Sequence, residues 1–209
     1  INHYWLGSKF LEYCVKQGWL RQQGSGGRGT KWYPTDKGRK ELKEKFGSSA
    51  VQVADEGGFV PPLKSVDERL EFILKAVEEL GYEKEFGFAI DAAASEFYDD
   101  GQYRMMEREY SSSELVEFYS DLSVKFKLMS IEDGLSEDDW NGWVKLNSEL
   151  GKKIQIVGDD LLVTNAARIQ KAIELNACNA LLLKLNQIGT VTEALGALKV
   201  ARKARWNII

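Results

Sequence analysis

Charged residues stand directly after short apolar runs at four places in this sequence. Asp91, Glu132 and Asp159 each follow such a run, and Lys184 follows three consecutive leucines. Clustered carboxylates repel one another and are tolerable only beside a cation, which a bound metal ion or a lysine supplies. If these four side chains converge, the sequence predicts a metal-dependent active site.

The apolar runs themselves predict the elements that would bring the charges together. They lie at 88–90, 128–131, 154–158 and 181–183, and an amphipathic helical pattern follows each of them. Short apolar runs that alternate with helices are typical of a parallel sheet buried on both faces, with its ligand at the carboxyl ends of the strands. The chain lacks the P-loop motif, and no dinucleotide-binding glycine motif occurs within the series of apolar runs and helical patterns, which favours a (β/α) barrel over an open sheet.

Helix boundaries follow from capping residues and apolar periodicity. Ser65 and Ser111 are each followed three residues later by a glutamate, which is the spacing of a capping box. The last helix is expected to bury Val191, Ala194, Leu195 and Leu198 on one face. The expected helices are 65–80, 111–122, 137–150, 166–175 and 190–205.

Composition limits the classes of protein to which the chain can belong. Its 209 residues, 44% hydrophobic and 29% charged, are ordinary for a soluble globular protein. No apolar stretch reaches the length of a membrane span and the first residues do not resemble a signal peptide, so we expect a cytoplasmic protein without a membrane partner. Cys14 and Cys178 are too few and too far apart for a disulfide framework, so we expect both to be reduced and to pack against other residues. The single histidine excludes catalytic or metal sites that need several histidines.

The amino-terminal segment differs from the rest in charge. Residues 1–47 contain ten Lys or Arg against four Asp or Glu, a balance of +6 in a chain whose total is −4. Such asymmetry predicts two units, which we assign to residues 1–44 and 45–209.

Residues 8–43 read as a helix, a basic hairpin with a glycine-rich turn, and a second helix capped by Thr35 or Asp36. This order resembles the second half of a winged-helix domain and implies a small α+β unit that binds duplex DNA. A solvated basic hairpin, for example from a fusion, explains the pattern equally well. The resemblance implies four side chains that contact phosphates: Lys9, Lys16, Arg28 and Lys31.

Sequence motifs at the predicted strand ends resemble those of enolase (phosphopyruvate hydratase) from about residue 45 to residue 209. They include Val-Ala-Asp-Glu-Gly-Gly-Phe at 53–59, where alanine replaces the family's first glycine, and Ile-Asp-Ala-Ala-Ala-Ser-Glu-Phe-Tyr at 90–98. Three more follow in the family's order: Ser-Ile-Glu-Asp at 130–133, Val-Gly-Asp-Asp-Leu at 157–161 and Leu-Leu-Leu-Lys-Leu-Asn-Gln-Ile-Gly-Thr at 181–190.

The resemblance implies an incomplete enolase-like (β/α) barrel and the reversible dehydration of 2-phosphoglycerate to phosphoenolpyruvate. It assigns the Mg²⁺ ligands to Asp91, Glu132 and Asp159, and the proton-abstracting base to Lys184. Glu56 matches an acid on the side from which hydroxide leaves. Since enolases are commonly dimers, it also implies a homodimer.

Parts of the family's pattern have no counterpart here, among them the capping domain, a Ser-His-Arg-Ser segment and a second active-site lysine. We therefore expect weak Mg²⁺ binding and no turnover by this chain alone.

Two alternatives stay open, namely a DNA-binding protein with a non-catalytic enolase-derived segment, and an interaction protein that buries open sheet edges against a partner. An acid at a strand end is often only a helix cap or a solvated loop residue. We expect this of four acids near the predicted site: Asp133, Asp138, Asp139 and Asp160.

Overall fold

The chain divides into two units, and each is described by itself. A computed structural model describes residues 15–23, 31–46 and 63–209. The first unit comprises residues 1–64 and the second residues 65–209. This division follows residue 64, whereas the units assigned from the sequence meet after residue 44.

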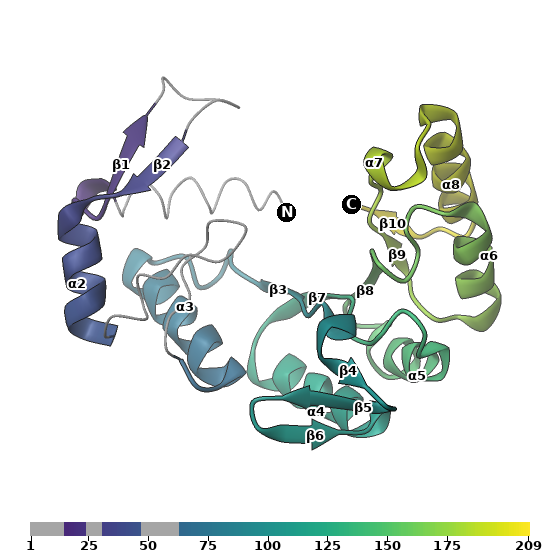
Figure 1. Cartoon of the computed structure of the whole chain (residues 1–209), viewed down its shortest axis with the longest axis horizontal. Helices are drawn as coiled ribbons and strands as arrows, with labels where there is room; N and C mark the ends of the chain where they lie inside the picture. Colours follow the sequence, from purple (N-terminus) through teal and green to yellow (C-terminus); the bar gives the residue numbers. More distant parts are fainter. Residues whose placement is uncertain (1–14, 24–30, 47–62) are drawn as a thin grey trace. The chain divides into compact units, whose positions relative to one another are not determined.

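The described part of the first unit is a strand pair followed by a helix. β1 (Leu20–Gln23) and β2 (Lys31–Pro34) pair antiparallel, and α2 (Asp36–Phe46) comes next (Figure 1). Thr35 Oγ1 accepts the backbone N–H of Gly38 at 3.0 Å and so begins the helix. Trp19, which directly precedes β1, donates from Nε1 to Glu41 Oε2 of α2 at 2.5 Å. The two predicted strands and the second predicted helix are therefore present, whereas most of the first predicted helix lies outside the described residues.

The side chains predicted to contact DNA are only partly described. Lys9 and Arg28 lie outside the described residues, and so does the side chain of Lys31, the first residue of β2. Lys16 is exposed and has helical backbone. The winged-helix interpretation of this unit therefore stays a prediction.

The second unit contains a five-stranded parallel sheet. Its strands are β3 (Phe88–Asp91), β7 (Leu128–Glu132), β8 (Gln155–Gly158), β9 (Ala180–Leu181) and β10 (Asn207–Ile208). The spatial order is β10-β9-β8-β7-β3, so each strand lies beside the next one along the chain. This progression is that of a (β/α) barrel, whereas a doubly wound sheet reverses its order. The predicted α/β class and partial barrel are confirmed.

Helices connect these strands and cover one side of them. Figure 1 shows α4, α5, α6 and α8 along the outer side of the strands. Among the described residues, no helix is long and apolar enough to cross a membrane. The helices are α3 (Val66–Leu80), α4 (Ser112–Lys125), α5 (Trp140–Leu150), α6 (Ala166–Leu175), the short α7 (Leu185–Ile188) and α8 (Val191–Lys203).

Capping residues fix where these helices begin. The Ser111 side chain accepts the N–H of Glu114, whose side chain accepts the N–H of Ser111, so the predicted capping box of α4 is present. Asp139 caps α5 and Thr190 caps α8 through side-chain oxygens. Such caps satisfy backbone N–H groups that lack a partner within the helix.

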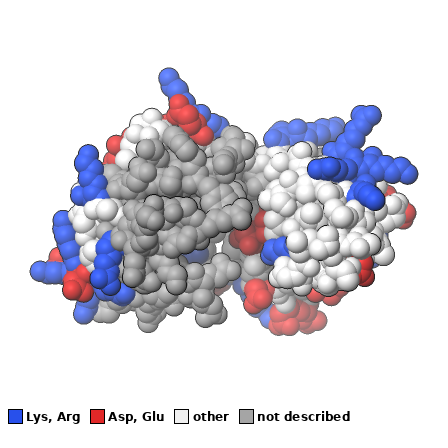
Figure 2. Space-filling view, turned by 90° about the horizontal axis from the view of Figure 1, so that it is seen from above, with Lys and Arg blue, Asp and Glu red and all other residues white. Residues whose placement is uncertain are grey.

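The buried face of α8 differs from the predicted one. Ala194, Ala197 and Ala201 are at most 1% exposed, whereas Val191 is 61% and Leu195 48% exposed. The small side chains allow α8 to approach its neighbours closely, so the larger apolar residues lie outside. Three basic residues of α8 are exposed, namely Lys199, Arg202 and Lys203. Figure 2 shows Lys and Arg side chains gathered on the surface at the upper right of its view.

A small antiparallel sheet between β3 and α4 is absent from the sequence-based prediction. It consists of β4 (Tyr98–Asp99), β5 (Gln102–Met105) and β6 (Arg108–Tyr110), and it follows the 3-10 helix η2 (Ala94–Phe97). Tyr103 on β5 is fully buried; its hydroxyl donates to Asp139 Oδ2 at 2.9 Å and accepts the N–H of Ser136 at 3.0 Å. These bonds attach the small sheet to the loop that follows β7.

Candidate functional site

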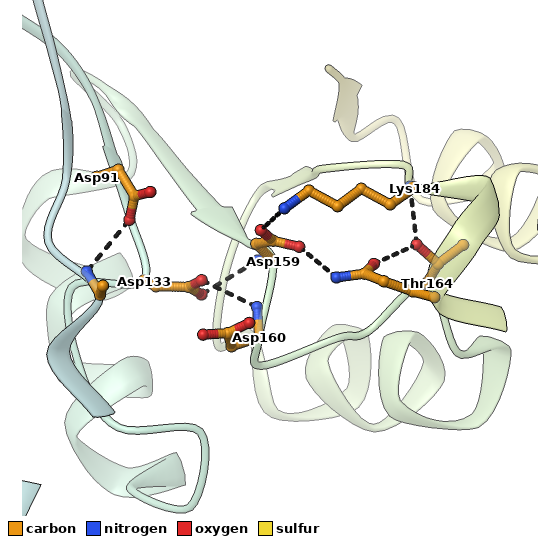
Figure 3. A network of polar contacts seen from close by, with 8 residues as sticks. Asp91, Asp133, Asp159, Asp160, Thr164 and Lys184 are labelled. Atoms are coloured by element: carbon orange, nitrogen blue, oxygen red, sulfur yellow. Dashed lines mark hydrogen bonds and ion pairs between the residues drawn. The ribbon is translucent and has the colours of Figure 1, made fainter. Parts of the chain in front are cut away.

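The four charged residues that follow the strands lie at one edge of the parallel sheet. Asp91 and Glu132 are the last residues of β3 and β7, and they are direct partners in the strand register. Asp159 follows β8, and Lys184 lies shortly after β9. Parallel strands bring their carboxyl ends to the same edge, as Figure 3 shows for three of these residues. Glu56 lies outside the described residues.

Among the described residues, the acids at this edge form two groups that share Asp133. Carboxylate oxygens of Asp91, Glu132 and Asp133 lie within 4.8 Å of one another, and so do those of Asp133, Asp159 and Asp160. Asp91, Glu132 and Asp159, which were expected to bind one cation together, therefore do not all lie in one group. Asp91 and Glu132 belong to the first group and Asp159 to the second. Each group offers the oxygen ligands that hard divalent cations prefer.

Asp133 joins the ends of β7 and β8, and the expectation of a helix cap or solvated residue is wrong for it. It is only 4% exposed. Its carboxylate accepts the backbone N–H of Asp159 at 3.1 Å and that of Asp160 at 2.9 Å (Figure 3). Asp139 is a cap as expected, and Asp138 and Asp160 are exposed. Asp133 therefore holds the loop that carries Asp159.

Burial and mutual repulsion raise the pKa values of these carboxyl groups. At Glu132 burial is the largest cause and repulsion from Asp91 the next, and together with other neighbours they raise its pKa to about 7. Burial raises the pKa of Asp133 to about 6, and it also raises the pKa of Asp91. Protons therefore compete with any cation that binds at this edge.

Lys184 makes an ion pair with Asp159. Its Nζ donates to Asp159 Oδ2 (Figure 3), and the Asp159 side chain is only 8% exposed. This hydrogen bond is the largest cause of the raised pKa of Lys184. The lysine is therefore directed into the acidic edge, which argues against a side chain that merely extends to solvent.

Two further residues belong to the site, although no sequence pattern assigned them to it. Gln187 contacts Asp159, and Thr164 contacts Gln187. Gln187 on α7 donates from Nε2 to Asp159 Oδ1 at 2.6 Å. Thr164 Oγ1 donates to Gln187 Oε1 at 2.8 Å and accepts the backbone N–H of Lys184 at 3.0 Å. Gln187 lies in a motif that the sequence does single out, but Thr164 lies in an irregular loop where no spacing marks it.

Comparison with known proteins finds matches among the enolases. The family described as "Enolase, C-terminal TIM barrel domain" matches residues 28–209. Enolase of Thermococcus gammatolerans is 53% identical over 175 residues, which are 82% of this chain and 41% of that protein. Enolase of Pyrococcus furiosus is 49% identical with the same coverage. Enolase 1 of Methanospirillum hungatei is 44% identical over 208 residues, 97% of this chain and 48% of the relative.

The chain spans less than half the length of these three relatives. The family match begins at residue 28 and so includes part of the basic segment. It also includes the whole five-stranded sheet and the acids of the two groups at its edge. This chain belongs to the enolase family.

Proposed function

We propose that this chain carries the cation-binding edge of an enolase-type active site. Asp91, Glu132 and Asp159 bind Mg²⁺, and Lys184 removes the proton beside the carboxylate of 2-phosphoglycerate. The reaction is the reversible dehydration of 2-phosphoglycerate to phosphoenolpyruvate. The observation that carries the proposal is the meeting of these carboxylates and Lys184 at the carboxyl edge of one parallel sheet.

The donors at this edge fit magnesium. Both acidic groups consist of carboxylates, which are hard oxygen ligands, and neither contains the histidine or cysteine that softer metals favour. Asp133 is shared by the two groups, so it lies close enough to both to influence a bound cation.

The environment of Lys184 is consistent with a base that depends on a cation. A lysine accepts a proton only after losing its own, and the hydrogen bond with Asp159 opposes that loss. The hydrogen bond opposes the loss of the lysine proton less strongly when Asp159 also binds a cation. In the enolase superfamily, the established role of bound magnesium is to stabilise the negative charge that develops on the substrate carboxylate.

Calorimetric titration of Mg²⁺ into the full chain tests the proposal. We expect the unaltered chain to bind, and Asp159→Asn to bind at least about 10-fold more weakly. Asp121→Asn is the matched control, since Asp121 is exposed on α4. Absence of binding, or equal affinity of the unaltered chain and Asp159→Asn, would contradict the proposal.

Formation of phosphoenolpyruvate is measured in the same samples. The sequence predicts no turnover by this chain alone, so cation binding is the primary result. Turnover that disappears in Lys184→Met would support the role of Lys184 and overturn the predicted inactivity.

Binding of duplex DNA and assembly into a homodimer stay predictions. Of the four basic side chains on which the DNA hypothesis rests, the structure describes only that of Lys16. A titration of duplex DNA at increasing salt decides it, because phosphate contacts weaken steeply as salt rises. No binding at low salt would reject the hypothesis.

A further inference from the structure

A chain of hydrogen bonds leads from Thr164 through Gln187 to Asp159. The Thr164 hydroxyl donates to Gln187 Oε1 at 2.8 Å, and Gln187 Nε2 donates to Asp159 Oδ1 at 2.6 Å. We call these three residues the threonine relay. Because the hydroxyl donates to the amide oxygen, the amide nitrogen is directed towards the carboxylate.

The relay also reaches the backbone of Lys184. The same Thr164 oxygen accepts the N–H of Lys184 at 3.0 Å, while Lys184 Nζ donates to the other carboxylate oxygen of Asp159 (Figure 3). The Asp159 carboxylate is therefore held at both oxygens, one by Gln187 and the other by Lys184. A single hydroxyl thus connects the position of the lysine with the orientation of the acid.

Thr164 occupies an unusual conformation for its residue type. Its φ is 53° and that of Val163 is 40°, both in the left-handed region that β-branched residues rarely adopt. Thr164 is also fully buried, with a relative exposure of 0%. Strained backbone of this kind persists only where the surroundings determine it, and it is frequent at functional sites.

We propose that Thr164 and Gln187 are positioning residues, which hold the Asp159 carboxylate and Lys184 in the arrangement that binds a divalent cation. This inference rests on the proposed function. Its physical basis is that a ligand already held in place loses less side-chain freedom on binding, and partners of metal ligands have large effects on affinity. The alternative is purely structural, with Thr164 serving only to hold the backbone at Lys184, where the short helix α7 begins.

The first measurement does not depend on a metal ion. In the cation-free chain, NMR should show the Gln187 side-chain amide proton that is donated to Asp159 protected from exchange with water. Thr164→Val keeps the branched shape but removes the hydroxyl, so we expect it to abolish this protection, and Thr164→Ser to retain it. Lack of this protection in the unaltered chain, or protection unchanged in Thr164→Val, would overturn the relay.

The second measurement is the affinity for Mg²⁺ by calorimetry. We expect Gln187→Met and Thr164→Val to weaken binding by about 10-fold or more, with Thr164→Ser restoring most of it. Asn186→Leu is the matched control, because Asn186 is an exposed amide beside Gln187, and its affinity should equal that of the unaltered chain.

Thermal unfolding of each variant separates positioning from a structural role. If Thr164 only holds the backbone where α7 begins, its loss would lower the melting temperature without changing the affinity of the folded protein, and that result would overturn the inference. If the unaltered chain binds no Mg²⁺, the proposed function fails, and the Gln187 amide signals then decide whether the relay exists.

Discussion

Glu132 combines partial burial with three acidic neighbours, which is favourable for holding a cation and unfavourable without one. Its pKa is raised to about 7 from an ordinary value of 4.5. The folded chain therefore binds this proton more tightly than the unfolded chain does. The contribution of Glu132 to stability is present below about pH 4.5 and is lost as the pH rises through about 7.

We accordingly predict that Glu132→Gln stabilises the cation-free protein at pH 8. Removing the charge should add about 1–2 kcal/mol to the free energy of unfolding, after allowance for screening by solvent. Near pH 4 the gain should vanish, since the glutamate is then protonated in both states. Urea unfolding with a chelator present at the two pH values measures this.

Glu117→Gln is the control for that measurement, because Glu117 is exposed on α4. A Glu132 variant no more stable than Glu117→Gln at pH 8 would show that the acidic edge is not under repulsion.

The buried hydroxyl of Tyr103 helps to attach the small antiparallel sheet to the loop after β7. Tyr103→Phe removes the partner of the buried Ser136 N–H and of Asp139. We predict a loss of about 1–3 kcal/mol in the free energy of unfolding, which is the cost of leaving a buried polar group unsatisfied. Denaturant unfolding measures it, with the half-buried Tyr98→Phe as control. Equal stability of the two variants would contradict this role.

Alanine substitutions at glycines in two helices should change the stability of the protein in opposite directions. A Cβ at Gly196 in α8 would meet no atom within 4 Å, so Gly196→Ala should stabilise the protein by about 1 kcal/mol through helix propensity. At Gly142 in α5 a Cβ would lie 2.4 Å from Asp139 Oδ2, so Gly142→Ala should displace this cap and destabilise by about 1 kcal/mol. Melting temperatures that shift in the same direction would reject the pair.

Cation binding should stabilise the molecule as a whole. A ligand that binds only the folded state at about 100 times its Kd adds about 2.7 kcal/mol, which for a chain of this size raises the melting temperature by about 5–10 °C. We predict such a rise with Mg²⁺, its reversal by a chelator, and its absence in Asp159→Asn. The same rise in Asp159→Asn would place the stabilising cation elsewhere.

Features set by neighbours in the sequence could be predicted from it. The capping box at Ser111, the strand that ends at Glu132 and the helix of residues 166–175 all depend on local spacing and periodicity, and the structure contains them. The charged residues at the strand ends were recognisable for the same reason, since a parallel sheet brings the carboxyl ends of its strands to one edge.

Only the tertiary structure decided which residues hold these charges in place. Asp133 bonds to the loop after the next strand, and Thr164 reaches Gln187 across 23 positions of sequence. The buried face of α8 likewise depends on how closely its alanines pack and not on the hydrophobicity of Val191 or Leu195. Local pattern determined the elements and the charges at their ends. Long-range hydrogen bonds and packing distances decided the arrangement of the site, because they join segments whose separation no periodicity records.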